Sequence, residues 1–214
     1  MTIDRAGYPF IGGTVALAIA AALTVGAAGA VPLLLLAAFF TFFFRDPDRE
    51  SPQDPRLVLS PADGRVLVAG PADARAAPPG EWKQISIFLS PADVHVNRSP
   101  VSGRVTRVNF RRGKYLPAYH RDAAASNERS EVWVEHHGST VVFRQIVGIL
   151  ARRVVCRVEP GAQLQAGERF GIMKFGSRMD VFLPPSTVIK VSVGDKVVGG
   201  VTVIAEMGTA ESKS

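Results

Sequence analysis

The chain has 214 residues, with 25 Lys and Arg against 19 Asp and Glu, which gives a net charge of +6. Hydrophobic residues make up 47% of the chain and charged residues 21%, and this balance excludes a disordered protein. The single cysteine excludes intrachain disulfides and any metal site built from several cysteines. The positive charge favours an acidic partner, either nucleic acid or anionic lipid.

The residues between Arg5 and Arg45 carry no charge. This stretch is about twice as long as the ~20 apolar residues that span a bilayer, and residues 26–32 in its middle are rich in Gly and Ala and end in Pro. We therefore predict two membrane helices, about 10–25 and 31–44, joined as a tight hairpin, with the second helix short for a complete span. A cleaved signal peptide would instead be followed by polar sequence. The basic flanks favour a hairpin with both ends in the cytoplasm.

The remaining sequence divides into a polar, proline-punctuated linker at residues 45–56 and one domain at residues 57–214, behind the hydrophobic anchor of residues 1–44. Short β-branched runs separated by Gly, Pro and Asp predict an all-β fold for this domain. The strands are expected at residues 84–89, 105–110, 131–135, 140–149, 154–158, 188–193 and 201–205. Residues 116–130 are polar and irregular, and we expect a long loop with at most one helical turn.

The domain contains an internal repeat. Residues 158–170 match residues 191–203 with their glycines aligned, and residues 60–66 match residues 99–105 in the same way. Aligned glycines mark tight turns, with apolar residues pointing inward between them. The repeat predicts a compact, internally repeated β-sandwich of the barrel-sandwich-hybrid kind, similar to the half-motifs of biotinyl and lipoyl carrier domains.

A Gly-Ser pair, Gly176-Ser177, lies in a late hairpin of the repeat. Alone it predicts only a turn, but three segments precede it in a specific order: Ser-Pro-Ala-Asp-Gly at residues 60–64, Ser-Pro-Ala-Asp-Val-His at residues 90–95 and Asn-Glu-Arg at residues 127–129. With these segments the chain resembles the phosphatidylserine decarboxylase proenzymes over about residues 45–207. A hydrophobic N-terminal anchor is also typical of that family.

The resemblance implies that the hydroxyl of Ser177 attacks the carbonyl of Gly176 and that the chain divides into residues 1–176 (β chain) and 177–214 (α chain). A pyruvoyl group made from Ser177 would be the covalent cofactor, with no metal. It would form a Schiff base with the amine of phosphatidylserine, accept electrons as carbon dioxide leaves, and release phosphatidylethanolamine. Serine is a weak nucleophile, so a base must take its proton.

The resemblance also implies an Asp-His-Ser maturation triad, in which Asp63 orients the imidazole of His95. From the residues alone, Asp63 fits a plain β-turn better than a catalytic role, and His95 fits a structural strand histidine as well as a base. Larger bacterial relatives carry a second histidine where this chain has Arg98, so the sequence resembles the shorter branch of the family. Either His95 serves alone as the base, or His120 contributes from its loop.

Four further residues are candidates for binding the substrate: Arg98, His120, Asn127 and Arg129. A guanidinium such as that of Arg129 binds phosphate or carboxylate in a bidentate manner, and the alternative for Arg129 is an ion pair with Glu128 or Glu131. His120 also fits an ordinary exposed loop residue.

Residues 104–121 hold six basic residues and no acidic one. They form either a solvated strand face or, as the adjacent membrane hairpin favours, a surface for anionic lipid. Nucleic acid is not expected, because the sequence shows no binding module for it. The expected location is the cell membrane, with the catalytic domain facing the cytoplasm. The expected partners are the substrate lipid and the two chains of the precursor, while a homodimer is left open.

Two other functions compete with the enzyme. Lys174 lies between the two repeats, where biotin acceptor domains carry their modified lysine, so the chain also fits a membrane-tethered carrier domain. A non-enzymatic membrane adaptor on the same β-sandwich would stay uncleaved and unmodified. Cleavage at Gly176-Ser177 separates the enzyme from both.

Overall fold

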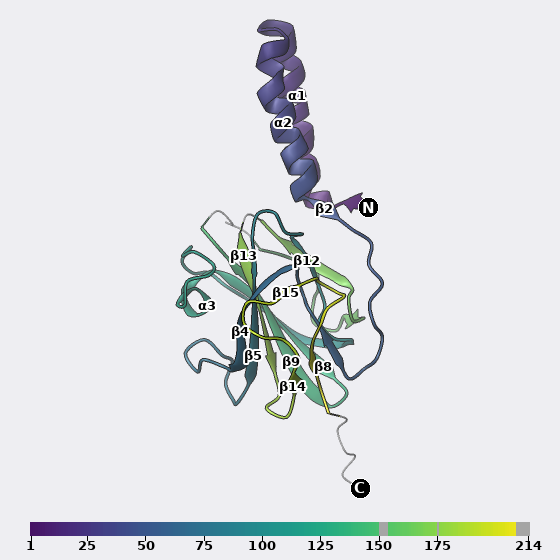
Figure 1. Cartoon of the computed structure of the whole chain (residues 1–214), viewed down its shortest axis with the longest axis vertical. Helices are drawn as coiled ribbons and strands as arrows, with labels where there is room; N and C mark the ends of the chain where they lie inside the picture. Colours follow the sequence, from purple (N-terminus) through teal and green to yellow (C-terminus); the bar gives the residue numbers. More distant parts are fainter. Residues whose placement is uncertain (150–153, 175, 209–214) are drawn as a thin grey trace.

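The computed structural model of the chain describes residues 1–149, 154–174 and 176–208. A hairpin of two helices stands on one end of a β-domain, as Figure 1 shows. This arrangement confirms the predicted all-β sandwich behind an N-terminal helical hairpin. The segment Arg5–Thr24 is long and apolar enough to cross a membrane, and the second helix is shorter.

The helical part has three elements: a 3-10 turn (Arg5–Gly7), α1 (Tyr8–Thr24) and α2 (Ala27–Phe43). The predicted gap between the two helices, at residues 26–30, is too long, because α2 already begins at Ala27. Gly26 makes the turn with a φ of 88°, a conformation that glycine adopts readily. Pro32 lies inside α2, just past the first turn, so the helix continues there without the hydrogen bond that a residue with an N–H would donate to the carbonyl of Ala28.

The largest sheet has eight strands. In spatial order they are β11 (Gln163–Leu164), β7 (Gly103–Arg111), β8 (Arg129–His136), β9 (Ser139–Val147), β13 (Ser177–Leu183), β5 (Lys83–Leu89), β4 (Gly64–Pro71) and β15 (Lys196–Val197). One three-stranded sheet consists of β10 (Val154–Cys156), β12 (Arg169–Met173) and β6 (Val96–Arg98), and another of β14 (Val188–Ile189), β16 (Val203–Glu206) and β3 (Leu57–Leu59). A small ribbon of β1 (Thr2–Ile3) and β2 (Arg45–Asp46) closes the base of the hairpin, and α3 (Ala123–Ser126) is the one helical turn expected in the long loop.

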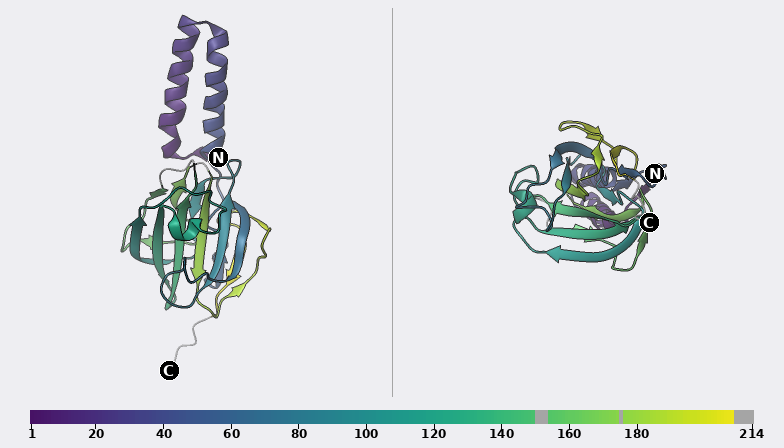
Figure 2. Two further views of the ribbon diagram at one scale, coloured as in Figure 1. Left: turned by 90° about the vertical axis from the view of Figure 1, so that its left-hand side faces the viewer. Right: turned by 90° about the horizontal axis from the view of Figure 1, so that it is seen from below.

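The eight-stranded sheet has an inner face, which packs on the main core, and an outer face. Successive side chains of a strand point to opposite faces. In β13, Met179 and Val181 belong to the main core, so Ser177 shares the inner face, whereas Arg178 and Asp180 lie on the outer face. Figure 2 (left) looks onto this sheet, with α3 in front of it. Residues on the two faces of β13 are therefore separated by the sheet itself.

The repeat in the sequence is also a repeat in the structure. Gly103 pairs with Leu164 between β7 and β11, and Gly64 pairs with Val197 in the same way between β4 and β15. The two three-stranded sheets correspond as well, with β12 and β16 as their central strands. The predicted internal repeat is thereby confirmed as two related halves of one sandwich.

Residues 45–56 run along the side of the β-domain, as Figure 1 shows. Nη2 of Arg98 lies 3.3 Å from the carboxylate of Asp46, and this pair is buried. Further along, Arg49 forms a bidentate pair with Asp63, at 2.6 and 2.9 Å. The segment predicted as a linker is therefore fastened to the domain by ion pairs.

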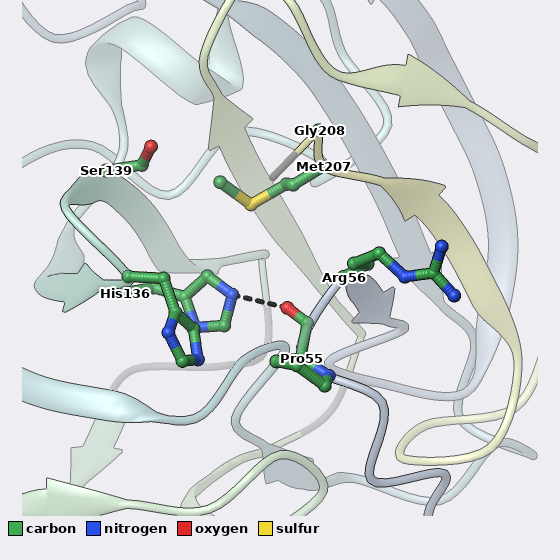
Figure 3. A pocket seen from close by; sticks show the side chains of 7 residues that line it. Pro55, Arg56, His136, Ser139, Met207 and Gly208 are labelled. Atoms are coloured by element: carbon green, nitrogen blue, oxygen red, sulfur yellow. Dashed lines mark hydrogen bonds between the residues drawn. The ribbon is translucent and has the colours of Figure 1, made fainter. Parts of the chain in front are cut away.

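His136 holds the other end of this segment. Its Nδ1 lies 2.6 Å from the carbonyl oxygen of Ser102 and its Nε2 lies 2.7 Å from that of Pro55. Figure 3 shows the contact with Pro55, at the edge of a cavity of about 330 Å³. The contact ties the segment to the end of β8.

Candidate active site

Ser177 opens β13 between two neighbouring strands. It pairs with Val147 at the end of β9 and with Leu89 at the end of β5. Its side chain is fully buried, and its Oγ has no hydrogen-bond partner among the residues that the structure describes. A buried hydroxyl without a partner is destabilising, and such groups in native proteins call for an explanation such as a catalytic role.

Gly176 presents its carbonyl at the same strand end. Its φ of 70° lies in the left-handed region, where a larger residue would be strained. The carbonyl oxygen faces Gly148 so closely that any side chain at position 148 would overlap it. Phe175, which precedes this pair, lies outside the described residues. The two glycines together let the Gly176 peptide fold against the end of β9, next to Ser177.

His95 follows a turn that its own segment builds. The carboxylate of Asp93 accepts hydrogen bonds from the N–H of Ser90, at 2.8 Å, and from its Oγ, at 2.7 Å. The Nδ1 of His95 lies 2.9 Å from the backbone oxygen of Asp93. Because a carbonyl oxygen only accepts, Nδ1 carries the proton and Nε2 keeps its lone pair. Nε2 is buried and has no partner in the described part of the chain.

Burial keeps the imidazole of His95 neutral. The loss of hydration lowers the pKa of His95 to about 4, while the hydrogen bond to Asp93 opposes this shift. The ring packs against Phe43 of α2, with 4.1 Å between ring centroids. Phe43 belongs to a small core that joins the end of α2 to Val96 and Ile172 of the β-domain. At neutral pH, His95 is therefore an uncharged base in an apolar site.

The backbone connects His95 to the strand that leads into Ser177. The carbonyl of His95 accepts a hydrogen bond from the N–H of Met173, the last residue of β12. The chain continues from β12 to Gly176 and Ser177. This connection and the contact with Phe43 place the imidazole at the end of the β-domain that carries the hairpin.

A triad aspartate is expected to accept a hydrogen bond from the imidazole, but the carboxylate of Asp63 has other partners. It accepts hydrogen bonds from Arg49 and from the N–H of Gly199, at 2.8 Å. Nδ1 of His95 is occupied by the Asp93 carbonyl instead. Asp63 still acts on the imidazole at longer range, because its charge raises the pKa of His95, although by less than burial lowers it.

Two of the candidate substrate-binding residues hold backbone segments in place. The amide of Asn127 bonds to both the N–H and the carbonyl of Leu116 and to the carbonyl of Val147, at 2.8 to 2.9 Å. Arg98 bonds to the carbonyl of Gly167, at 2.9 Å, besides its pair with Asp46. Asn127 thereby positions the end of β9, which pairs with Ser177, and Arg98 positions the segment before β3.

The other two candidates have partners of their own within the protein. Arg129 pairs with Ile146, which pairs with Arg178, so its side chain lies on the outer face of the sheet. Its Nη1 donates to the carbonyls of the α3 turn. His120 is half exposed in the loop before α3, with Nδ1 3.8 Å from the carboxylate of Asp122.

A buried polar pair on the inner face was not found from the sequence. Nε2 of Gln145 donates to Oδ1 of Asn97, at 2.8 Å, and Ser130 donates to Gln145 from the next strand. Nδ2 of Asn97 has no partner among the described residues. The one signal in the sequence is an asparagine directly after the alternating Val-His-Val run.

Lys174 lies over the ring of Phe10 in α1, with 4.8 Å from Nζ to the ring centroid. A carrier lysine must instead extend into solvent for its cofactor to swing between sites. The geometry therefore does not favour a carrier function for this lysine.

Comparison with known proteins identifies the family. The family model for phosphatidylserine decarboxylase matches residues 36–205. A phosphatidylserine decarboxylase proenzyme of Chlorobaculum parvum is 44% identical over 179 residues, which cover 84% of this chain and 83% of the relative. The proenzyme of Desulfotalea psychrophila is 39% identical over 206 residues and 96% of both chains. That of Solibacter usitatus is 44% identical over 193 residues, 89% of this chain and 91% of its own.

The match covers the β-domain and the end of the hairpin, and the relatives align along nearly the whole chain. The chain therefore belongs to the phosphatidylserine decarboxylase family and is a carboxy-lyase.

Proposed function

We propose that the chain is a self-processing, pyruvoyl-dependent enzyme that converts phosphatidylserine to phosphatidylethanolamine and carbon dioxide, with the reactive group made from Ser177. The observation that carries this proposal is the unpartnered, fully buried Oγ of Ser177 directly after Gly176, whose own Cβ position meets open space. The relatives are named proenzymes, which supports a processing step.

The proposed maturation uses Ser177, Gly176 and His95. Nε2 of His95 takes the hydroxyl proton of Ser177 as Oγ attacks the carbonyl carbon of Gly176. The peptide C–N bond breaks, the nitrogen of residue 177 becomes an amine, and an ester joins the two residues. Loss of the Cα proton of residue 177 breaks the ester C–O bond and leaves Gly176 with a free carboxylate. Hydrolysis of the resulting enamine consumes one water and releases one ammonia.

His95 and Asp63 have separate tasks in this scheme. The Asp93 carbonyl holds the tautomer of His95 that exposes a basic Nε2. The negative charge of Asp63 stabilises the imidazolium that forms when Nε2 accepts the proton, since this charge favours the protonated form. The buried, apolar surroundings from Phe43 limit the access of water to the ester, so that elimination precedes hydrolysis, and a water is needed only for the enamine that follows.

The site fits a pyruvoyl group, because the buried end of β13 already holds residue 177 between β5 and β9. Such a group supplies a carbonyl that captures the substrate amine and accepts the electron pair released as carbon dioxide leaves. The chain's own contribution is to hold this residue in a dry site at the end of the domain nearest the hairpin.

The location of the site suits a lipid substrate. The base of α2 covers His95, so the reacting groups lie beside the segment that we place in the membrane. We assign the β-domain to the cytoplasmic face, where the basic flanks of the hairpin are favoured. There the basic residues of 104–121 face anionic lipid, and the α and β chains remain paired as neighbouring strands of one sheet.

The test compares Ser177→Ala with Ser186→Ala, which removes an exposed hydroxyl from the same α-chain segment. Ser177→Ala should remain one full-length chain and form no phosphatidylethanolamine from phosphatidylserine in mixed micelles. Ser186→Ala should mature and turn over like the unmodified protein. A cleaved or active Ser177→Ala protein would disprove the proposed chemistry.

A further inference from the structure

A cleft of about 360 Å³ lies on the outer face of the eight-stranded sheet, on the opposite side from Ser177. It is lined by strands β7, β8 and β9 and by the Ala-Pro-Pro segment at residues 77–79. Its charged and aromatic side chains are Arg107, Arg111, Arg129, Arg144, Glu131 and Trp133. Four guanidinium groups therefore share this cleft with one carboxylate.

The strand pairing brings like charges together. Arg111 and Arg129 are direct cross-strand partners between β7 and β8, on the same face of the sheet. Like charges in that position destabilise a sheet. Two backbone carbonyls of the α3 turn hold Nη1 of Arg129, which fixes its guanidinium in the cleft.

The one carboxylate in the cleft already has several partners. Glu131 pairs with Arg144 and also accepts hydrogen bonds from Nε1 of Trp133, at 2.6 Å, and from Asn109, at 3.4 Å. Burial lowers the pKa of Arg129, and the charges of Arg144 and Arg111 lower it further. The protein therefore leaves an excess of positive charge in a partly enclosed space.

We propose that this cleft binds an anion that carries a phosphate group. Guanidinium groups bind phosphate through paired, charge-assisted hydrogen bonds, and a phosphate between Arg111 and Arg129 would remove their repulsion. The same phosphate chemistry is offered by free phosphate and by the headgroup of an anionic phospholipid. Because the sheet separates the cleft from Ser177, this site is distinct from the site of decarboxylation.

The chain carries its own reporter for this site. It has two tryptophans, Trp82 and Trp133, and they contact each other edge to face at 6.2 Å. Arg107 lies over the ring of Trp133, at 3.9 Å, so an anion that draws this guanidinium away changes the surroundings of the indole. Tryptophan fluorescence of the full-length protein therefore reports on the cleft without a label.

The experiment titrates inorganic phosphate into the detergent-solubilised full-length protein at constant ionic strength, with chloride as the reference salt. We expect a saturable fluorescence change and a higher unfolding temperature. Arg111→Gln should weaken phosphate binding about tenfold or more, as the loss of a charge-assisted contact predicts. Arg104→Gln is the matched control, since Arg104 is an exposed arginine of the same strand that does not line the cleft.

A second arm separates the two sources of phosphate. The protein is reconstituted in phosphatidylcholine bilayers with or without phosphatidylglycerol, neither of which is the proposed substrate. A response to phosphatidylglycerol alone, reduced by Arg111→Gln and kept by Arg104→Gln, supports the site with a lipid headgroup as its ligand. No response in either arm, or equal responses in the two variants, overturns the proposal. The fluorescence does not depend on catalysis, so this failure would leave the proposed decarboxylation untouched.

Discussion

Phe43 covers the imidazole of His95, with 4.1 Å between ring centroids and 34° between ring planes. Phe43 is the last residue of α2, whereas His95 belongs to the β-domain. Both side chains are fully buried. The contact makes the foot of the helical hairpin a wall of the candidate active site, so the anchor does more than hold the enzyme near lipid.

Replacement of Phe43 tests this coupling. Phe43→Ala should open the site to water, so that the pKa of His95 moves back toward its ordinary value and self-cleavage slows below about pH 6.5. The lost packing should also lower the free energy of unfolding by about 3 kcal/mol. The measurement is the rate of self-cleavage between pH 5 and 8, followed by gel electrophoresis.

Phe42→Ala is the control, because Phe42 is half exposed on the same turn of the same helix. It should leave the pH profile of cleavage unchanged. Equal profiles for the two variants would show that the covering ring has no influence on the base.

The low pKa of His95 predicts an unusual acid limit for maturation. With its pKa near 4, Nε2 stays unprotonated far below neutral pH. Self-cleavage of the unmodified protein should therefore stay nearly constant from pH 8 to about pH 5 and decline only toward pH 4. A decline centred near pH 6.5 would mean that the base is exposed to water.

The same shift affects stability. The folded protein binds a proton at His95 only near pH 4, whereas the unfolded chain binds it near pH 6.5, so the unfolded state holds more protons between these values. The free energy of unfolding should fall as the pH decreases through this range, by about 3 kcal/mol from this group. Urea unfolding of Ser177→Ala with and without His95→Gln should show a weaker pH dependence without the histidine.

Asp63 and Arg49 form an ion pair, and replacing each residue separately distinguishes a role in self-cleavage from a role in stability. Asp63→Asn removes the charge that stabilises the imidazolium, so self-cleavage should slow by about tenfold. Arg49→Met leaves that charge in place and should affect mainly stability, because a partly buried carboxylate loses its partner. If both variants slow cleavage equally, then Asp63 acts only by fastening residues 45–56.

The close approach of the Gly176 carbonyl to Gly148 leaves no room for a side chain at position 148. In Gly148→Ala the added methyl group would overlap the carbonyl oxygen of Gly176, so the peptide must move away from Ser177 and cleavage should slow strongly. Gly70→Ala is the control, since a methyl group at that strand position meets open space. Circular dichroism checks that both variants fold, and normal cleavage of Gly148→Ala would exclude the close approach.

The sequence was sufficient for the class of fold and for its repeat, because both depend on local patterns. β-branched runs and aligned glycines are properties of neighbouring residues, and the strands pair accordingly. The strand β13 was missed because Arg178 and Asp180 interrupt its hydrophobic pattern. They are buried as an ion pair on the outer face, which only the neighbouring strands make tolerable.

The sequence indicates which residues form the candidate site, but it does not indicate which residues they contact. The motifs pointed to Ser177, His95 and Asp63, yet the partners of His95 turned out to be Phe43 and the Asp93 carbonyl. The contact with Phe43 joins segments far apart in the chain, and no local pattern records it. Strand register decides on which side of the sheet Arg129 lies. The Asn-Glu-Arg motif alone does not predict that register.

The central claim is that Ser177 becomes the reactive group, and the intact mass of the purified, denatured protein tests it most directly. The account predicts two chains, residues 1–176 with a free carboxylate and residues 177–214 lighter by one ammonia than a chain that begins with serine. One unmodified full-length chain that persists in an enzyme active on phosphatidylserine would contradict it.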